Sequence, residues 1–241
     1  MSLFVYDEGY LLSDKRKCFS NLIVPSGIRF GDPDTITDSQ VKIKLVTKED
    51  AMPTLNYSAM KAYGFYGPDV LLATLISTIK EVGLNNKSLD LLFVDTEDFT
   101  GQLIPFGIVC LFENGTLLHL CGTPVYHPYA DTTRMINKKI LIRVDKCSAK
   151  DTVIINTDPG VAANLCLMRK IIKKLPSQDT SRLAESIFLM NAYFDPYASM
   201  CYSVYGLKEN HLFETVCRDS DDIDGFISVL NENVDLRFNK R

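Results

Sequence analysis

Two cysteines and two histidines lie close together in the middle of the chain, where they could bind a metal ion or form a Cys–His catalytic pair. Cys110 precedes an Asn114-Gly115 dipeptide, and His119 and Cys121 follow it. A two-residue type I′ turn at Asn-Gly would place Cys110 directly across from His119 in a β-hairpin, with Cys121 on the same face. His127 follows as a fourth candidate ligand, and zinc binds cysteine and histidine in tetrahedral sites.

The same side chains also fit an ordinary hydrophobic core. No CxxC or HxxxH spacing supports a metal site, and Ile108, Phe112 and Leu117 are predicted to share the face. A cysteine nucleophile also needs surroundings that lower its pKa, which spacing alone does not provide. We therefore predict buried thiols and a hydrogen-bonded histidine, with no catalytic residue, metal or cofactor. A small cysteine-dependent or metal-assisted enzyme centred on Cys110 and its two partners is the alternative.

A basic stretch from Arg134 to Lys174 is the strongest charge feature of the chain. It contains ten basic and three acidic residues, although the whole chain has a net charge of −4. Phosphate groups of lipids and nucleic acids attract such clusters of positive charge. Seven bases are predicted to contact an anionic partner, a membrane surface or a nucleic acid: Lys138, Lys139, Arg143, Arg169, Lys170, Lys173 and Lys174.

Four of these bases belong to a predicted amphipathic helix over residues 161–175. At about 100° per residue, its leucine, isoleucine and methionine side chains cover one side and the bases cover the opposite side. A helix that packs on a core and turns a solvated face outward has the same pattern. Binding of an anionic partner is therefore a hypothesis that the helix pattern alone does not decide.

The C-terminal region carries the opposite charge. Six carboxylates and no basic residue lie between Asp219 and Asp235. The run from Ser220 to Ile227 has the glycine of an EF-hand loop but lacks its acidic residues at the first and twelfth positions. An acidic helix N-terminus explains the run better, and the segment is our candidate for self-association.

Several catalytic and nucleotide-binding signatures are missing from the sequence. Neither GxGxxG nor GxxxxGK[ST] occurs, and the glycine cluster from Gly64 to Gly67 lacks the lysine of a phosphate loop. The GxSxG motif of a nucleophile elbow is missing as well. The absence of these motifs argues against the classes of nucleotide-binding proteins and hydrolases that use them.

Strands are expected to position these residues in the first two thirds of the chain. Strand patterns cover residues 4–12, 41–46, 89–94, 108–112, 117–121, 139–144 and 152–155. The Asn-Gly hairpin is apolar on both faces, which predicts a central place in the sheet. Gly67-Pro68-Asp69 begins the best helix pattern, and Gly83 is placed to end it.

After Pro159-Gly160 the pattern becomes helical, with helices predicted over residues 161–175, 180–194 and 222–234. The predicted fold class is therefore α+β, a mostly antiparallel sheet with a central Asn-Gly hairpin and a helix-rich C-terminal third. The sequence has no internal repeat and no long linker. We expect a single domain over residues 1–241, with a candidate sub-boundary near 158–160.

Composition and cysteine usage predict a cytoplasmic protein. The chain of 241 residues is 46% hydrophobic and 23% charged, as globular proteins are. Its longest apolar stretch, Val70 to Ile79, is too short for a transmembrane helix, and the first residues lack the features of a secretory signal. Seven cysteines, an odd number without a CxxC pair, predict reduced and mostly buried thiols.

These patterns lead to one main hypothesis. We expect a non-enzymatic cytoplasmic binding or assembly protein, forming homo-oligomers, whose basic segment contacts a membrane surface or a nucleic acid such as RNA. Small α+β matrix proteins of enveloped RNA viruses have comparable physical traits, so the hypothesis includes a viral structural or accessory protein. No motif of this chain matches them, and no residue is carried over from them.

Overall fold

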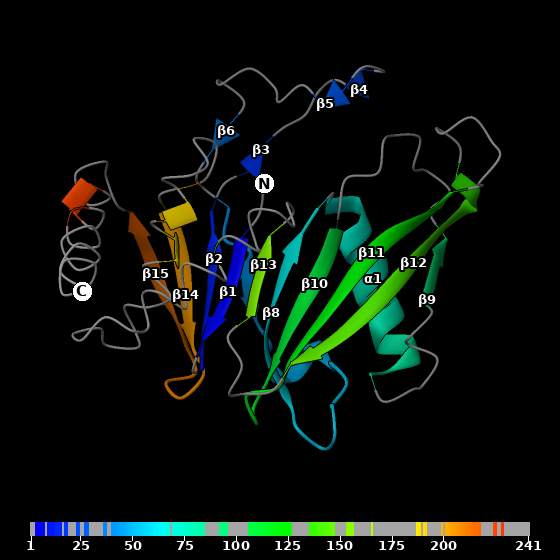
Figure 1. Cartoon of the computed structure of the whole chain (residues 1–241). Coiled ribbons are helices and arrows are strands. Elements are labelled where there is room, and N and C mark those ends of the chain that lie inside the picture. The colour runs from blue at the N-terminus through cyan, green and yellow to red at the C-terminus, as the bar shows by residue number, and fades with distance from the viewer. Residues whose placement is uncertain are drawn as a thin grey trace, which may run out of the picture. The chain divides into compact units, whose positions relative to one another are not determined.

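Two antiparallel β-sheets dominate the structure, a computed structural model of the chain (Figure 1). One has five strands in the order β13-β1-β2-β14-β15, and the other has six in the order β7-β8-β10-β11-β12-β9. Two short ladders pair β3 with β6 and β4 with β5. The structure describes residues 3–7, 9–15, 17–18, 23–24, 27–28, 36–37, 40–67, 69–84, 92–95, 106–126, 135–147, 153–156, 165, 187–188, 190–191, 199, 201–217, 224–225 and 228.

The five-stranded sheet brings early and late segments of the chain together. Its strands are β1 (Leu3–Asp7), β2 (Tyr10–Asp14), β13 (Val153–Asn156), β14 (Cys201–Gly206) and β15 (His211–Cys217). The single strand predicted over residues 4–12 is wrong, because the chain reverses between β1 and β2. Gly9 has a φ of +94°, a left-handed conformation that glycine adopts without steric cost.

The five-stranded sheet buries both of its faces. On one face Leu3, Val5 and Leu12 belong to a core cluster that also contains Ile187 and Phe188. These last two residues have helical backbone, so part of the C-terminal region packs on this sheet. The other face carries large side chains that are at most 1% exposed, namely Phe4, Tyr6, Leu11 and Tyr205. Both faces therefore contribute to the hydrophobic stabilisation.

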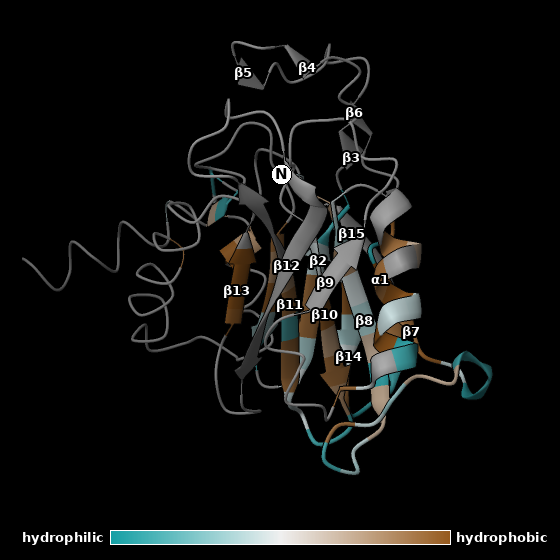
Figure 2. Ribbon diagram, turned by 90° about the vertical axis from the view of Figure 1, so that its right-hand side faces the viewer, coloured by the Kyte–Doolittle hydropathy of each residue, from teal (hydrophilic) through white to brown (hydrophobic). Residues whose placement is uncertain are grey.

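The six-stranded sheet packs its helix on one face. Its elements are β7 (Ile43–Leu45), β8 (Met60–Tyr66), β9 (Leu92–Asp95), β10 (Phe106–Phe112), β11 (Leu117–Tyr126), β12 (Met135–Cys147) and α1 (Asp69–Val82). Leu75 and Ile79 of α1 join Ile108, Cys110 and Phe112 in one core cluster. In Figure 2, α1 shows a hydrophobic and a hydrophilic side.

The helix and the central hairpin confirm two sequence predictions. α1 begins at Asp69 and ends at Val82, and the following Gly83 has a φ of +76°. The strands β10 and β11 pair with each other and lie between β8 and β12. The apolar character of both hairpin faces therefore identified an interior position correctly.

The predicted fold class, one mostly antiparallel sheet with a helix-rich C-terminal third, is wrong, because the strands form two antiparallel sheets and part of the C-terminal third is strand. The described residues are mostly antiparallel strand, and α1 is the one α-helix among them with defined bounds. Residues 201–217 form β14 and β15, and β14 pairs with β2. The segment from Cys201 to Gly206 contains two tyrosines and a valine, residue types that are enriched in strands. The described residues of the three predicted helices have helical backbone, namely Leu165, Ile187, Phe188, Met190, Asn191, Asp224, Gly225 and Ser228. The rest of those helices lies outside the described residues.

The chain divides into two compact units. One comprises Met1–Cys18, Asp34–Val41 and Lys150–Arg241 and holds the five-stranded sheet, and the other comprises Phe19–Pro33 and Lys42–Ala149 and holds the six-stranded sheet. The short strands are β3 (Lys17–Cys18), β4 (Ile23–Val24), β5 (Gly27–Ile28) and β6 (Ile36–Thr37), and η2 (Lys48–Asp50) is a 3₁₀ turn. The single domain stays a prediction. Among the described residues, no helix combines the length and hydropathy needed to cross a membrane.

Candidate functional site

The turn between β10 and β11 differs from the predicted two-residue type. The Gly115 N–H donates to the Phe112 carbonyl at 2.8 Å, and the Phe112 N–H donates to the Thr116 carbonyl at 3.0 Å. Gly115 has a φ of +77°, whereas Asn114 is not left-handed. This geometry is a three-residue loop, a type I turn followed by a glycine bulge. It shifts the pairing register by one residue from the predicted one.

The shifted register separates the residues that were predicted to converge. Val109, and not Cys110, pairs with His119, and Gly107 pairs with Cys121. Successive residues of a strand lie on opposite faces of a sheet, so a one-residue shift moves a side chain to the other face. Cys110 therefore packs on the face covered by α1, while His119 and Cys121 lie on the opposite face, which we call the histidine face. The predicted convergence of the three side chains is wrong.

Cys110 has the environment of an unreactive thiol. Its exposed fraction is 0%, and burial raises the pKa of its thiol from 9.0 to about 12. The thiolate is the nucleophilic form of cysteine, and a thiol with this pKa stays protonated at neutral pH. Cys110 is therefore a core residue, in agreement with the prediction of buried thiols and in contrast to the enzyme alternative.

His119 forms a hydrogen bond with a tyrosine two strands away. Tyr66 Oη and His119 Nε2 are 2.8 Å apart, and the ring centroids are 5.9 Å apart. Tyr66 ends β8, and Gly107 of β10 is its register partner. A Cβ atom at Gly107 would lie 2.6 Å from Tyr66 Oη and 2.5 Å from the Leu120 carbonyl oxygen. The missing side chain at Gly107 thus gives the tyrosine ring room to reach His119.

Tyr66 was not predicted from the sequence, in which residues 64–67 stood out only as a glycine cluster. The available signal was an aromatic residue at the end of a strand pattern together with a glycine in a partner strand. Such a glycine often marks a place where another group approaches the backbone closely. Because strand order and register decide which glycine meets which ring, this signal could not be used before the sheet was known.

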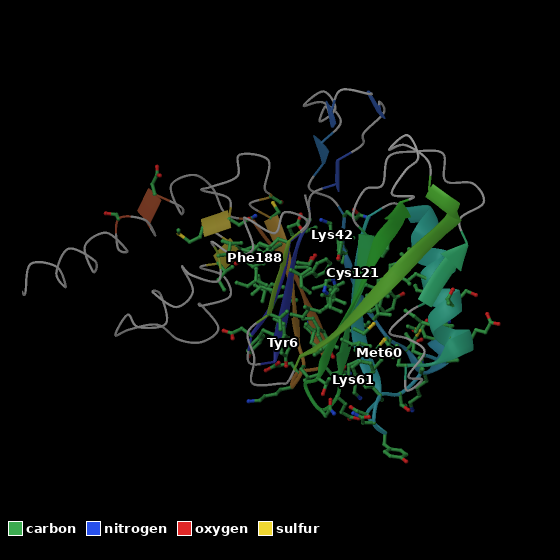
Figure 3. The ribbon with its side chains drawn as sticks, turned by 45° about the vertical axis from the view of Figure 1, so that its right-hand side comes forward. Tyr6, Lys42, Met60, Lys61, Cys121 and Phe188 are labelled. Carbon is green, nitrogen blue, oxygen red and sulfur yellow. The ribbon has the colours of Figure 1, made fainter. Side chains whose placement is uncertain are left out.

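The histidine face also carries a cysteine, two residues after His119. Cys121 forms no disulfide and is half-buried, and its register partners are Gly107 and Arg143. Figure 3 shows Cys121 toward one end of the six-stranded sheet and Met60 toward the other. Either ring can be the donor of the Tyr66–His119 hydrogen bond, depending on the tautomer of the imidazole. Among the described residues, no three His, Cys, Asp or Glu side chains gather in a way that could hold a metal ion.

The residues predicted to contact an anionic partner are only partly described. Lys138, Lys139 and Arg143 belong to β12, an interior strand between β11 and β9. In register, Lys139 pairs with Asp95 and Arg143 pairs with Cys121. Arg169, Lys170, Lys173 and Lys174 lie outside the described residues, as does the candidate metal ligand His127. Their gathering into one surface stays a prediction.

The acidic C-terminal segment is described at three positions. Asp224, Gly225 and Ser228 have helical backbone and are exposed. This agrees locally with the predicted helix over residues 222–234, whose other residues lie outside the described part of the chain. Self-association through this segment stays a prediction.

A disulfide bond at Cys201 is a second feature that sequence reasoning missed. Cys201 is disulfide-bonded in the structure, whereas Cys110 and Cys121 are free. The odd number of cysteines had predicted reduced thiols, and Cys201 departs from this prediction. An odd count excludes complete pairing but allows individual disulfides.

Comparison with known proteins identified no relative from which a function could be inferred. No protein-family model matches this chain, and no curated protein matches its sequence. The functional argument therefore depends on the charges, contacts and burial of the chain itself.

Proposed function

We propose that this protein is a non-enzymatic binding and assembly protein of the cytoplasm, whose basic segment contacts an anionic partner. One observation carries the proposal: the 13-residue strand β12 holds four of the basic residues, Lys138, Lys139, Arg143 and Lys146, and one acidic residue, Asp145. A strand of this length extends over about 43 Å at ~3.3 Å per residue. Because successive residues of a strand alternate between the two faces of a sheet, Lys139 and Arg143 share the histidine face, while Lys138 and Lys146 belong to the opposite face. Lys139 and Arg143 can therefore meet phosphate groups of a membrane surface or a nucleic acid strand together.

The chemistry of the thiols favours binding over catalysis. The enzyme alternative needed Cys110, His119 and Cys121 on one face, but Cys110 packs under α1 with a raised pKa. Tyr66 and His119 then serve as a hydrogen-bonded pair that satisfies two polar groups within an apolar sheet. In the same proposal, the acidic segment from Asp219 to Asp235 mediates self-association.

The expected affinity follows from the number of charges. Each lysine or arginine near an anionic lipid surface contributes about 1 kcal/mol, so four to six of them supply roughly 4–6 kcal/mol. On nucleic acid, the logarithm of the affinity falls with the logarithm of salt concentration by about 0.9 per neutralised phosphate of duplex, or about 0.7 for single strands. Binding to either partner is thus salt-dependent.

Charge reversal tests the proposal directly. The full chain is titrated with vesicles containing an anionic phospholipid and, separately, with single-stranded RNA at low salt. The strand variant is Lys138→Glu/Lys139→Glu/Arg143→Glu, and the helix variant is Arg169→Glu/Lys170→Glu/Lys173→Glu. The matched control is Lys44→Glu/Lys48→Glu/Lys80→Glu, which makes the same change in charge at exposed positions outside the basic segment.

The proposal expects the strand or helix variant to lose at least tenfold in affinity while the control keeps most of the binding. Equal losses in all variants would show that only the net charge matters, and no binding by the wild type would refute the basic segment as a contact. Because glutamate could disturb β12, a glutamine version of the strand variant and a circular dichroism spectrum accompany the measurement. Competition between vesicles and RNA then decides which partner is preferred.

A further inference from the structure

The disulfide at Cys201 has one partner that fits the strand register. Cys201 is the first residue of β14, and the residue paired with it across the ladder is Cys217, the last residue of β15. Directly opposite residues of antiparallel strands have Cα atoms about 4.5–5.5 Å apart. Disulfides join residues with Cα atoms about 4.4–6.8 Å apart. The register therefore places Cys217 within disulfide range of Cys201.

We propose that Cys201 is bonded to Cys217 and that this disulfide is a redox-sensitive latch that holds the edge strand β15 in the five-stranded sheet. The latch lies at the open end of the β14–β15 hairpin. At the other end the chain reverses through residues 207–210, where Asn210 has a φ of +48° and its Oδ1 accepts a hydrogen bond from Tyr205 Oη at 2.9 Å. The hairpin is thus closed at both ends.

The ladder itself is weak near the latch. The register of β14 and β15 shifts between Tyr202 and Val204, so the regular pairing is interrupted one step from Cys201. A bulge of this kind leaves a residue out of the ladder. The two strands would fray from their open end first, and a covalent bond there prevents this opening.

The described side chains of the edge strand, at residues 211–213, are only slightly buried. His211 is exposed, Phe213 is 40% exposed, and Leu212 is only half-buried. In contrast, every residue of β14 from Cys201 to Gly206 is buried or half-buried. Within the five-stranded sheet β15 is the edge strand, and among the described strands it pairs with β14 alone.

Low-molecular-weight thiols of the glutathione class can open the latch. A thiolate attacks one sulfur of the disulfide, and the other sulfur leaves as a thiolate and takes up a proton. A second thiol then attacks the resulting mixed disulfide, which releases the first cysteine as a thiol and yields one oxidised disulfide of the small molecule. Two electrons and two protons pass to the protein, and the covalent link between β14 and β15 is lost.

Peptide mapping identifies the disulfide partner. Trypsin cuts after Arg182, Lys208 and Arg218, so Cys201 and Cys217 fall in separate peptides with one cysteine each. Non-reduced digests of the alkylated full chain should contain peptides 183–208 and 209–218 linked together. A link from Cys201 to any other cysteine, or an alkylated Cys201, would overturn the assignment.

Hydrogen exchange tests the latch. In the wild type, dithiothreitol should speed the exchange of amides 211–217 by on the order of 100-fold, the effect expected for opening a loop of about 15 residues. The variant Cys201→Ser/Cys217→Ser should exchange fast with or without dithiothreitol, and Cys121→Ser should respond as the wild type does. If the linked peptides are found but exchange at 211–217 does not change on reduction, the bond exists without acting as a latch. Neither measurement involves an anionic partner, so the result is independent of the proposed binding function.

Discussion

The two antiparallel hairpins β10–β11 and β14–β15 differ in their surroundings. β10 and β11 lie inside the six-stranded sheet, and their side chains from Ile108 to Phe112 are 0% exposed. β15 lies at the edge of the five-stranded sheet and exposes His211 and Phe213. The position of a hairpin in its sheet therefore decides how far its side chains are exposed to solvent and to reagents.

The cysteines of the two hairpins show this difference most clearly. Cys110 is enclosed by apolar side chains, and burial raises its pKa to about 12. Cys201 is half-buried at the end of an outer ladder and is disulfide-bonded. A thiol in the interior is protected from redox chemistry, while a thiol at the edge is available to it.

Truncating one phenylalanine in each hairpin should give the largest contrast. Phe112→Ala removes a fully buried side chain from the cluster under α1 and should lower the free energy of unfolding by about 3–5 kcal/mol. Phe213→Ala loses a half-exposed ring and its edge contact with His211 and should cost about 0.5–1 kcal/mol. Urea unfolding of both variants measures the difference, and equal losses would contradict the distinction between centre and edge.

Gly107→Ala should disturb the central hairpin by an intermediate amount. The new Cβ would approach the Leu120 carbonyl oxygen at 2.5 Å and Tyr66 Oη at 2.6 Å, and the backbone oxygen cannot move away easily. We expect a loss of about 1–3 kcal/mol in the free energy of unfolding. Tyr66→Phe is the control, because it removes the hydrogen bond to His119 without adding volume and should cost about 1 kcal/mol. A neutral Gly107→Ala would show that the ring does not need this space.

The raised pKa of Cys110 should make the free energy of unfolding depend measurably on pH. Between pH 9 and 12 the unfolded chain loses the proton of this thiol, while the folded chain keeps it until its pKa of about 12. The contribution to stability is therefore complete below pH 9 and declines as the pH rises, by about 1.4 kcal/mol per pH unit. Cys110→Ala should lack this part of the slope. Subtracting its unfolding free energies from those of the wild type removes the similar contribution of the buried tyrosines, and parallel profiles would disprove the shift.

Local patterns were sufficient to predict the elements whose boundaries depend on short-range chemistry. The helix from Asp69 to Val82 was predicted from Pro68, Asp69 and Gly83, which favour helix ends through local backbone preferences. The central hairpin was predicted from Asn114-Gly115 and two apolar flanks. The register of this hairpin was predicted wrongly, because Asn-Gly supports both the two-residue turn and the observed three-residue loop.

The candidate site was predicted in part. His119 and Cys121 were named from the sequence, but Tyr66 joins them from a strand more than fifty residues earlier, and Cys110 does not. The C-terminal strands were missed because tyrosine, serine and valine in β14 are compatible with several structures until a partner strand is available. β14 finds that partner in β2, at the other end of the chain.

The sequence by itself determined the two ends of α1, the place of the Asn-Gly turn, which segments are apolar and where the basic and acidic charges lie, since these properties depend on neighbouring residues. Only the tertiary structure decided which face each side chain occupies, that Gly107 admits the Tyr66 ring, and that Cys201 lies across from Cys217. These outcomes depend on strand order and on a register in which a single residue exchanges the two faces of a sheet. The contacts responsible join distant segments, so no local pattern contains them.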